Sequence, residues 1–284
     1  MFKSLYNITG NLDIIFSKDF IPISMDIDKE FSNLAKKIND VATTIQNNDN
    51  NYKKVSESKS QFIANATHEF RTPLFSLKGY IETLQNGAIN DNKVNRIFLK
   101  KMYHQIERLE KLFNNLIDIS KIESNNIIIN SDEILLNNIM LYLSDNFSEL
   151  AKNKGLTFFV PNTAKLYVKG DIELLKICFS NLVDNAIKYS KEGTVSVSVK
   201  NWGNSVHIKV IDNGIGIAEE YHQNIFDRFF RVEDSRSQDT GGHGLGLSIV
   251  KHILKGHSSE IFVKSTLGQG SIFSFNLNKI VPNN

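Results

Sequence analysis

The sequence predicts a multidomain protein in which an all-α antiparallel helical hairpin is followed by an α+β sandwich. In the first half, apolar residues recur at steps of three and four, which is typical of amphipathic helices. In the second half, short alternating apolar and polar runs are separated by turns rich in glycine and asparagine, which is typical of strands. The 284 residues are enough for one to three domains. We expect three, at residues 1–50, 51–126 and 131–280, with the main boundary at 123–130.

Composition excludes several classes of function. The chain carries 33 basic and 31 acidic side chains, so it lacks the basic surface of a nucleic-acid-binding protein. Its single cysteine, Cys178, rules out an internal disulfide framework and lies in an apolar run that predicts burial. No run approaches the ~18 apolar residues of a membrane-spanning helix. We expect a cytoplasmic chain, either by itself or as the cytoplasmic portion of a membrane protein whose spanning segment lies upstream of Met1.

Residues 1–50 predict one amphipathic helix. The apolar positions follow each other at steps of 3, 4, 3 and 4, like the seam of a coiled coil; they are Phe31, Leu34, Ile38, Val41 and Ile45. The run of asparagines at 46–51 is expected to be a helix break or a solvated stretch.

Two further apolar stripes predict a helical hairpin. The first comprises Ile63, Phe70, Leu74, Leu77, Ile81 and Leu84. The second comprises Met102, Ile106, Leu109, Phe113 and Leu116. A turn rich in asparagine and aspartate, Gly87–Asn95, separates them, so the two helices are expected to be antiparallel neighbours. A hairpin leaves apolar surface uncovered, and we therefore expect a homodimer that forms a four-helix bundle.

The second half predicts two β-hairpins and a helical layer. Alternation at 195–199 and 206–210 brackets a turn at 201–204, and a similar pair occurs at 260–265 and 271–276. Helical patterns expected to cover one face of the sheet lie at 134–152, 172–189 and 245–256.

The first candidate site is His68. It falls on the outer face of the first hairpin helix, away from the apolar stripe, and Thr72 lies one turn further on nearly the same face. A neutral imidazole accepts a phosphoryl group when a carboxylate holds its other N–H, and Glu69 is the candidate for that role. Thr72 could orient a water for the reverse reaction. Pro73 removes one helical hydrogen bond, so a bend is expected near His68.

The second candidate site is a nucleotide pocket. Asn181, Asn185 and Lys188 are spaced i, i+4 and i+7, so two carboxamides and an ammonium share one helix face, as a Mg²⁺-polyphosphate requires. Asp212 follows a strand and can accept a hydrogen bond from an exocyclic amine. The glycine-rich run 241–247 leads into a helix and offers free N–H groups to a phosphate. Taken singly, a plain turn or an unspecific glycine run explains each of the last two signals equally well.

Both candidate sites resemble motifs of a known protein family. The segment Phe62–Leu74 resembles the phosphoacceptor box of bacterial two-component sensor histidine kinases. The order of the segments 181–190, 212–217, 226–231, 241–247 and 268–270 is similar to the boxes of the histidine-kinase ATP-binding domain. That domain has the Bergerat or GHKL fold, which is shared with Hsp90, gyrase and MutL ATPases.

The resemblance implies a protein-histidine kinase that phosphorylates His68 from ATP and passes the phosphoryl group to an aspartate of a response-regulator receiver domain. It implies that Asn185 binds Mg²⁺, Asn181 and Lys188 lie near phosphates, Tyr189 flanks the base, and Asp212 binds the adenine amine. Residues 227–242 would form a lid over ATP, anchored by Phe226 and Phe229. The other nucleotide-binding positions implied are Gly214, Gly216, Arg228, Arg231, Gly242, Gly244, Leu245 and Gly246.

Two alternatives stay open at this point. Thr72 also fits a signalling scaffold in which phosphatase activity on the partner dominates. An Hsp90-type conformational ATPase is disfavoured, because Asn181 stands where those relatives have a catalytic glutamate and an amide cannot act as a base.

Two positions depart from the pattern of the histidine kinase family. His243, where a small hydroxyl residue is usual, is interpreted as tolerated, and Phe75 as either an addition to a docking surface or a packing residue. Residues 1–50 vaguely resemble a HAMP-like linker.

Overall fold

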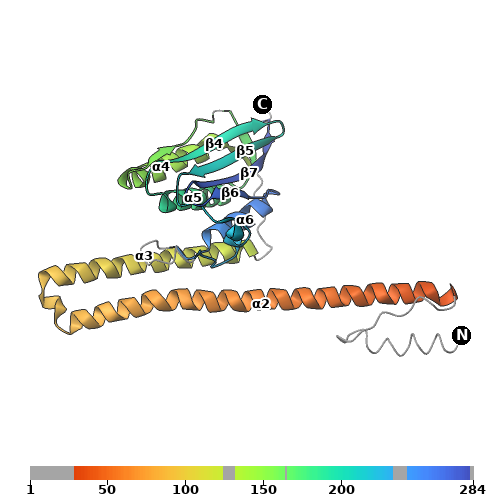
Figure 1. Ribbon diagram of the computed structural model, residues 1–284, viewed down its shortest axis with the longest axis horizontal. Helices are drawn as coiled ribbons and strands as arrows, with labels where there is room; N and C mark the ends of the chain where they lie inside the picture. The colour runs from red at the N-terminus through yellow and green to blue at the C-terminus, as the bar shows by residue number, and fades with distance from the viewer. Residues whose placement is uncertain (1–28, 124–131, 164, 233–241, 282–284) are drawn as a thin grey trace. The chain divides into compact units, whose positions relative to one another are not determined.

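The computed structural model describes residues 29–123, 132–163, 165–232 and 242–281. The chain divides into two compact units, residues 1–67 and 68–284. Helix α2 (Lys29–Gln85) begins in the first unit and ends in the second (Figure 1). Expectations for residues 1–28 and 124–130 lie outside the described residues. None of the helices in the described ranges combines the length and the hydropathy that a bilayer span requires.

Helix α2 is continuous through the asparagine run, so the expected helix break at 46–51 is wrong. Asparagine costs no more than about 0.7 kcal/mol per residue in a helix relative to alanine. Helix propagation is cooperative, and a short polar stretch between two helical segments adds hydrogen bonds without a new nucleation step. The long helix therefore outweighs the local preference of these residues.

The predicted hairpin is confirmed in the second unit. After α2, a short 3₁₀ helix, η1 (Ala88–Asn90), leads into α3 (Asn92–Glu123). Asp91 Oδ1 accepts hydrogen bonds from the N–H groups of Lys93 (2.9 Å) and Val94 (3.2 Å), which caps the start of α3. The rings of Tyr80 and Phe98 pack 5.5 Å apart across the two helices.

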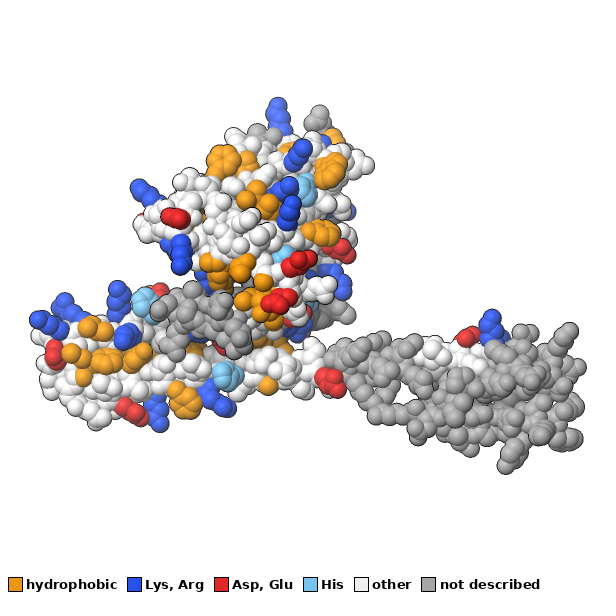
Figure 2. All heavy atoms as spheres, viewed as in Figure 1, with side chains coloured by type: hydrophobic (Ala, Val, Ile, Leu, Met, Phe, Trp, Pro, Cys, Tyr) orange, Lys and Arg blue, Asp and Glu red, His pale blue; other side chains and the backbone are white. Residues whose placement is uncertain are grey.

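The hairpin keeps much of its apolar stripe uncovered. On α3, Leu112 and Ile119 are buried, whereas Ile106 and Phe113 are 45% and 57% exposed. Figure 2 shows hydrophobic side chains reaching the surface of the hairpin among lysines and arginines. The large apolar side chains of α2 that are exposed within residues 56–85 are Ile63, Leu74, Phe75 and Ile81. Phe75 is 65% exposed, so it adds to this apolar surface and does not pack within the described chain.

The rest of the second unit is built on one mixed sheet. Its strands are β1 (Asp132–Leu135), β2 (Thr157–Phe159), β3 (Tyr167–Gly170), β4 (Thr194–Trp202), β5 (Ser205–Asp212), β6 (Phe262–Thr266) and β7 (Gly270–Ile280). The order is β1-β3-β7-β5-β4-β2, and β6 also pairs with β7. Only the β2–β4 pair is parallel among these strands. Both predicted hairpins, β4–β5 and β6–β7, are confirmed.

Three helices cover one face of this sheet, which confirms the α+β sandwich (Figure 1). They are α4 (Leu136–Asn153), α5 (Ile172–Tyr189) and α6 (Gly246–Gly256). Two short 3₁₀ helices, η2 (Glu219–Tyr221) and η3 (Asn224–Phe226), follow β5. The helix expected from residue 134 begins at Leu136, because Ile134 belongs to β1 and pairs with Val168. Cys178 is buried as predicted.

A buried histidine joins the end of α6 to the start of α5. His257 Nδ1 lies 2.8 Å from the carbonyl oxygen of Ile253, so it donates that bond. This fixes Nε2 as the acceptor of the N–H of Asp171, at 3.0 Å. The ring also fills the space where a side chain at Gly170 would lie. Asp171 in turn caps α5, so His257 helps set where α5 begins.

We predict that His257→Leu lowers the free energy of unfolding by about 1–3 kcal/mol, because it leaves the Asp171 N–H without its acceptor. Denaturant titration followed by circular dichroism would measure this. The matched control is His104→Gln on the exposed surface of α3, where a change within about 0.5 kcal/mol is expected. Equal effects of the two substitutions would contradict the assigned role.

Candidate active site

His68 is exposed on α2, and Thr72, also exposed, lies one turn further along the helix. The Thr72 hydroxyl donates a long hydrogen bond of 3.4 Å to the carbonyl oxygen of His68. Within the described residues, the imidazole of His68 makes no hydrogen bond, ion pair or ring contact. The outward orientation predicted from the apolar stripe is therefore confirmed, and both side chains are open to a second molecule or domain.

Glu69 is half-buried and is directed at the second hairpin helix. Its Oε2 atom lies 3.7 Å from Nη2 of Arg108, and within the described residues this atom accepts no hydrogen bond. No hydrogen bond joins Glu69 to His68 in the described part of the chain. The role of Glu69 in fixing the His68 tautomer stays a prediction. Pro73 lies inside α2 and is buried, and the bend predicted near His68 stays a prediction.

Helix α5 carries the predicted nucleotide face. One side of the helix, including Leu182, Val183, Ala186 and Ile187, is buried in the core. This leaves Asn181, Asn185 and Lys188 half-buried on another side. The carboxamide of Asn181 is oriented, because its Nδ2 donates to the carbonyl oxygen of Ile177 at 2.9 Å. Its Oδ1 is therefore the atom turned toward the glycine run.

The glycine run lies directly against α5. A side chain at Gly242 would collide with the ammonium of Lys188, and a Cβ at Gly246 would lie 2.7 Å from Oδ1 of Asn181. Gly244 and Leu245 lie between these two contacts, where the Gly244 carbonyl oxygen accepts the N–H of Phe229 at 2.9 Å. The structure thus brings together two segments that are more than 50 residues apart in the sequence.

Lys188 is held in a positively charged environment. Its Nζ donates to the hydroxyl of Tyr189 at 3.2 Å and lies 4.7 Å from the centre of that ring. Burial lowers the pKa of Lys188 to about 8, and the nearby charges of Arg231, Lys111 and Arg108 act in the same direction against the opposing effect of Asp184. A bound anion would relieve this repulsion.

The Asp212 loop docks onto the end of α5. The N–H of Ile215 donates to the carbonyl oxygen of Tyr189 at 3.1 Å. Asp212 is 6% exposed, and its Oδ1 accepts the N–H groups of Gly214 (2.8 Å) and Ser271 (3.1 Å). Burial raises the pKa of Asp212, although these two bonds oppose the shift. Within the described residues Oδ2 accepts no hydrogen bond, so one oxygen is fixed and the other is left for a ligand.

Gly216 completes that loop. Its φ of 69° is in the left-handed region, and a side chain there would collide with the carbonyl of Thr266. Glycine is therefore required by the approach of the β6–β7 turn. The predicted positions Gly214 and Gly216 both hold the loop in place around Asp212.

The segment after β5 is anchored by aromatic packing. Phe226 lies edge-on against Phe273 with ring centres 6.5 Å apart, which confirms it as a packing residue. Phe229 bonds through its backbone to Gly244. Arg228 and Arg231 are half-buried, and burial lowers the pKa of Arg228. Most of the predicted lid, residues 233–241, lies outside the described residues.

Two lysines that the sequence did not single out also shape the site. Lys154 donates from Nζ to the carbonyl oxygens of Ile187 (2.7 Å) and Lys188 (2.6 Å), which satisfies the end of α5. Lys111, on α3, donates to Oδ2 of Asp184 at 2.7 Å. The sequence gives a weak signal for Lys154 alone, because a lysine near the end of a helix can donate to free carbonyl groups. It gives no signal for Lys111.

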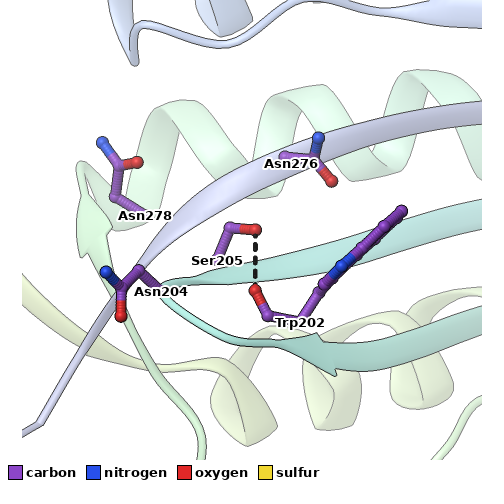
Figure 3. A pocket seen from close by; sticks show the side chains of 5 residues that line it. All are labelled: Trp202, Asn204, Ser205, Asn276 and Asn278. Carbon is purple, nitrogen blue, oxygen red and sulfur yellow. Dashed lines mark hydrogen bonds between the residues drawn. The ribbon is translucent and has the colours of Figure 1, made fainter.

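A surface depression elsewhere on the sheet is distinct from this site. It is lined by Trp202, Asn204, Ser205, Asn276 and Asn278 around the β4–β5 turn, where the Ser205 hydroxyl donates to the Trp202 carbonyl oxygen (Figure 3). Ser205 begins β5 and Asp212 ends it, so the depression and the Asp212 loop are at opposite ends of that strand.

Two family models match the chain. Residues 58–125 match the His Kinase A (phospho-acceptor) domain, and residues 170–280 match the family of histidine kinase-, DNA gyrase B- and HSP90-like ATPases. The first match contains His68, and the second contains the nucleotide residues from Asn181 to Gly246. The chain therefore contains a phospho-acceptor domain of the His Kinase A family and an ATPase domain of the family of histidine kinase-, DNA gyrase B- and HSP90-like ATPases.

Relatives among curated proteins are sensor histidine kinases. The chain is 34% identical over 229 residues to sensor histidine kinase WalK of Bacillus subtilis (strain 168), covering 79% of this chain and 37% of WalK. It is 34% identical over 225 residues to sensor-like histidine kinase SenX3 of Mycolicibacterium smegmatis, covering 79% of this chain and 58% of SenX3. The chain thus spans less than two thirds of the length of either relative.

Solved histidine kinases share the fold. The structure of histidine kinase ThkA in complex with response regulator protein TrrA matches with a TM-score of 0.64 and 23% identity, over 82% of this chain and 67% of that one. Acinetobacter baumannii histidine kinase AdeS matches with a TM-score of 0.60 and 23% identity, over 74% of this chain and 97% of that one. These matches confirm a helical region followed by a GHKL-type domain.

We predict that ATP binding by the ATPase domain of this chain weakens as pH rises through 8. Lys188 is charged below its pKa of about 8 and neutral above it, so the dissociation constant should rise about tenfold between pH 7 and pH 9. Calorimetric titration at several pH values would measure this. In Lys188→Gln the affinity should be weak at every pH. The exposed neighbour Lys191, replaced by Gln, is the control and should keep the wild-type profile.

Proposed function

We propose that this chain is the catalytic portion of a sensor histidine kinase that phosphorylates its own His68 from ATP and passes the phosphoryl group to an aspartate of a response-regulator receiver domain. One observation carries the proposal. An exposed histidine on a hairpin helix is present in the same chain as a phosphate cradle in which Gly242 lies against Lys188 and Gly246 against Asn181.

Different residues of the site bind different parts of ATP. Lys188 supplies positive charge, and the glycine run supplies backbone N–H groups at the start of α6, where anions bind well. Oδ2 of Asp212 accepts the hydrogen bond of the adenine amine, with Tyr189 beside the base. Arg228 and Arg231 lie on the phosphate side of the lid.

The donor set fits Mg²⁺ held mainly by ATP. Mg²⁺ usually binds through one or two protein oxygens together with phosphates and waters. In the described residues no cluster of three histidine, cysteine or acidic side chains is present that could hold a metal ion without a nucleotide. Asn185, one turn from Asn181 on α5, supplies the protein oxygen. The ion, when bound, neutralises charge on the phosphates.

Transfer needs little covalent help from the protein, because phosphoryl transfer is catalysed mainly by positioning and charge neutralisation. The lone pair of His68 Nε2 attacks the terminal phosphorus, and the bond to the bridging oxygen breaks with its electrons passing to ADP. Glu69 is the group that accepts the Nδ1 proton. Because His68 is exposed, the ATP-binding domain and a receiver domain can reach it in turn.

The exposed stripe of the hairpin supports a homodimer. Ile81, Ile106 and Phe113 remain about half exposed in one copy, and burying the rest of each side chain against a second copy contributes about 1 kcal/mol each. The four-helix bundle is the arrangement that covers them. Phe75 extends apolar surface to within two turns of His68, and a receiver domain docking there would contact it.

Phosphatase activity on the phosphorylated partner is a second candidate function of the same face. The Thr72 hydroxyl is exposed, and its only hydrogen bond to the described residues is long, at 3.4 Å. It can therefore turn to orient a water toward a phosphoaspartate.

His68→Ala should abolish incorporation of label from γ-labelled ATP and Mg²⁺. The product in the wild-type chain should be acid-labile and base-stable, as expected for phosphohistidine. Asn185→Ala should reduce labelling by at least about 100-fold, because it removes a group that positions the phosphates. His104→Gln, an exposed histidine on the partner helix of the hairpin, is the matched control and should label normally. Undiminished labelling of His68→Ala would sink the proposal.

Mixing His68→Ala with Asn185→Ala tests whether transfer occurs between protomers. In a dimer that phosphorylates in trans, the mixture should recover labelling on the Asn185→Ala chain. Labelling within one protomer predicts no recovery.

Thr72→Ala should slow dephosphorylation of a phosphorylated receiver domain by about 10-fold or more while leaving His68 labelling within about threefold of wild type. Thr83→Ala is the control, since Thr83 is on the same helix and bonds to its own backbone in the same way. If Thr72→Ala and wild type release phosphate from the partner at equal rates, the hydroxyl has no part in hydrolysis.

A further inference from the structure

Arg108 of α3 connects the phosphoacceptor helix to the glycine run. Its Nη2 lies 3.7 Å from Oε2 of Glu69, the residue next to His68, and its Nε donates to Nε2 of His243 at 3.4 Å. The side chain is only 19% exposed. One guanidinium therefore contacts the acceptor side and the donor side of the reaction at once.

Neither contact is a short, strong hydrogen bond of the Arg108 guanidinium. Charge-assisted hydrogen bonds of arginine are normally about 2.7–2.9 Å long, and both contacts are much longer. Oε2 of Glu69 is buried and accepts no hydrogen bond from any described residue. His243 is buried, and burial together with the charge of Arg108 lowers the pKa of His243 to about 4, so it offers only a neutral ring nitrogen.

The surroundings of Arg108 hold more positive than negative charge. Arg108, Lys111, Lys188 and Arg231 are all close enough to His243 to lower its pKa. Two carboxylates face them: Asp184 is bonded to Lys111 at 2.7 Å, and Glu69 makes the long contact to Arg108. Such a cluster attracts a polyanion, and planar guanidinium is the side chain best suited to a phosphoryl group.

We propose that Arg108 is a positioning residue for the phosphoryl group that is transferred. When ATP occupies the cradle, Arg108 turns from Glu69 and His243 to the terminal phosphate and holds it on the path to His68. Release of Glu69 leaves that carboxylate free to accept the Nδ1 proton of His68 as Nε2 forms its bond to phosphorus. The Pγ–O bond breaks with its electron pair on ADP, so ATP and a neutral imidazole give ADP, phosphohistidine and a protonated Glu69.

This inference rests on the proposed kinase function and extends it to a residue outside the ATP-binding motifs. It also gives His243 a role that its interpretation as merely tolerated does not include. A small hydroxyl side chain at that position would not reach as far as the imidazole does, whereas His243 holds the guanidinium close to the cradle before ATP arrives.

Binding of ADP and of a non-hydrolysable ATP analogue to the full chain tests the proposal. Arg108→Gln should weaken binding of the triphosphate about tenfold and leave ADP within about twofold, because only the terminal phosphate contacts the guanidinium. The rate of His68 labelling at saturating ATP should fall about 100-fold. Arg108→Lys should be intermediate, since it keeps the charge and loses the planar fork.

Arg96→Gln is the matched control, because it removes the same charge from an exposed position on the same helix and should change neither affinity nor rate. Equal losses for ADP and the triphosphate in Arg108→Gln would indicate a packing role and overturn the proposal. Wild-type affinity and rate in that variant would overturn it too. Absence of labelling in the wild-type chain would contradict the kinase function instead, and the ratio of the two affinities would still decide the role of Arg108.

Discussion

The position of the Lys188 ammonium is the constraint on which the site depends. The group is half-buried among other cations, and its pKa is lowered to about 8 as a result. Such an arrangement costs free energy in the folded chain, since desolvation and repulsion both disfavour the charged form. An anion in the same space would offset this cost. Gly242 has no side chain to fill that space, and α6 begins four residues further along the chain, at Gly246.

Two segments next to Lys188 make hydrogen bonds that hold the end of α5 in place. The last carbonyl groups of a helix have no partner within the helix. Here Lys154 donates to the carbonyl oxygens of residues 187 and 188, and Ile215 donates to that of Tyr189. Two separate segments, the end of α4 and the Asp212 loop, are thereby tied to the same turn. The carboxylate of Asp212, proposed to bind adenine, and the ammonium of Lys188, proposed to bind phosphate, are consequently tied to the same turn of α5.

Local periodicity was enough to predict the hairpin, both β-hairpins and the helical layer, because each depends on a pattern of burial within a few turns or one strand pair. It failed at Ile134, where an apolar run continues from strand β1 into α4 without a turn residue between them. It also missed β2 and β3, which have only three and four residues. Strands this short contain too few alternations to be distinguished from a loop.

The sequence predicted those residues of the site that belong to contiguous motifs. Asn181, Lys188, Asp212 and the glycine run fall in such motifs, and the structure brings them together. Arg108, Lys111 and Lys154 reach the site only through tertiary packing, from 135, 73 and 33 residues away in the sequence, and as single basic residues on helices they look like ordinary surface charges. Sequence spacing within one element does not encode such contacts.

The chemistry around Asn181 favours transfer of phosphate over its hydrolysis. An ATPase needs a base beside the terminal phosphate to activate water. The amide of Asn181 has no such capacity, and it is held in place by its bond to Ile177. Asp184, an acid on the same helix α5, already has its Oδ2 bonded to Lys111 at 2.7 Å. In the proposed kinase, a cradle without a base to activate water would leave bound ATP intact until a better nucleophile arrives, and His68 is exposed enough to be that nucleophile. The lack of such a base would therefore allow one bound ATP to wait for the movement that presents it to His68.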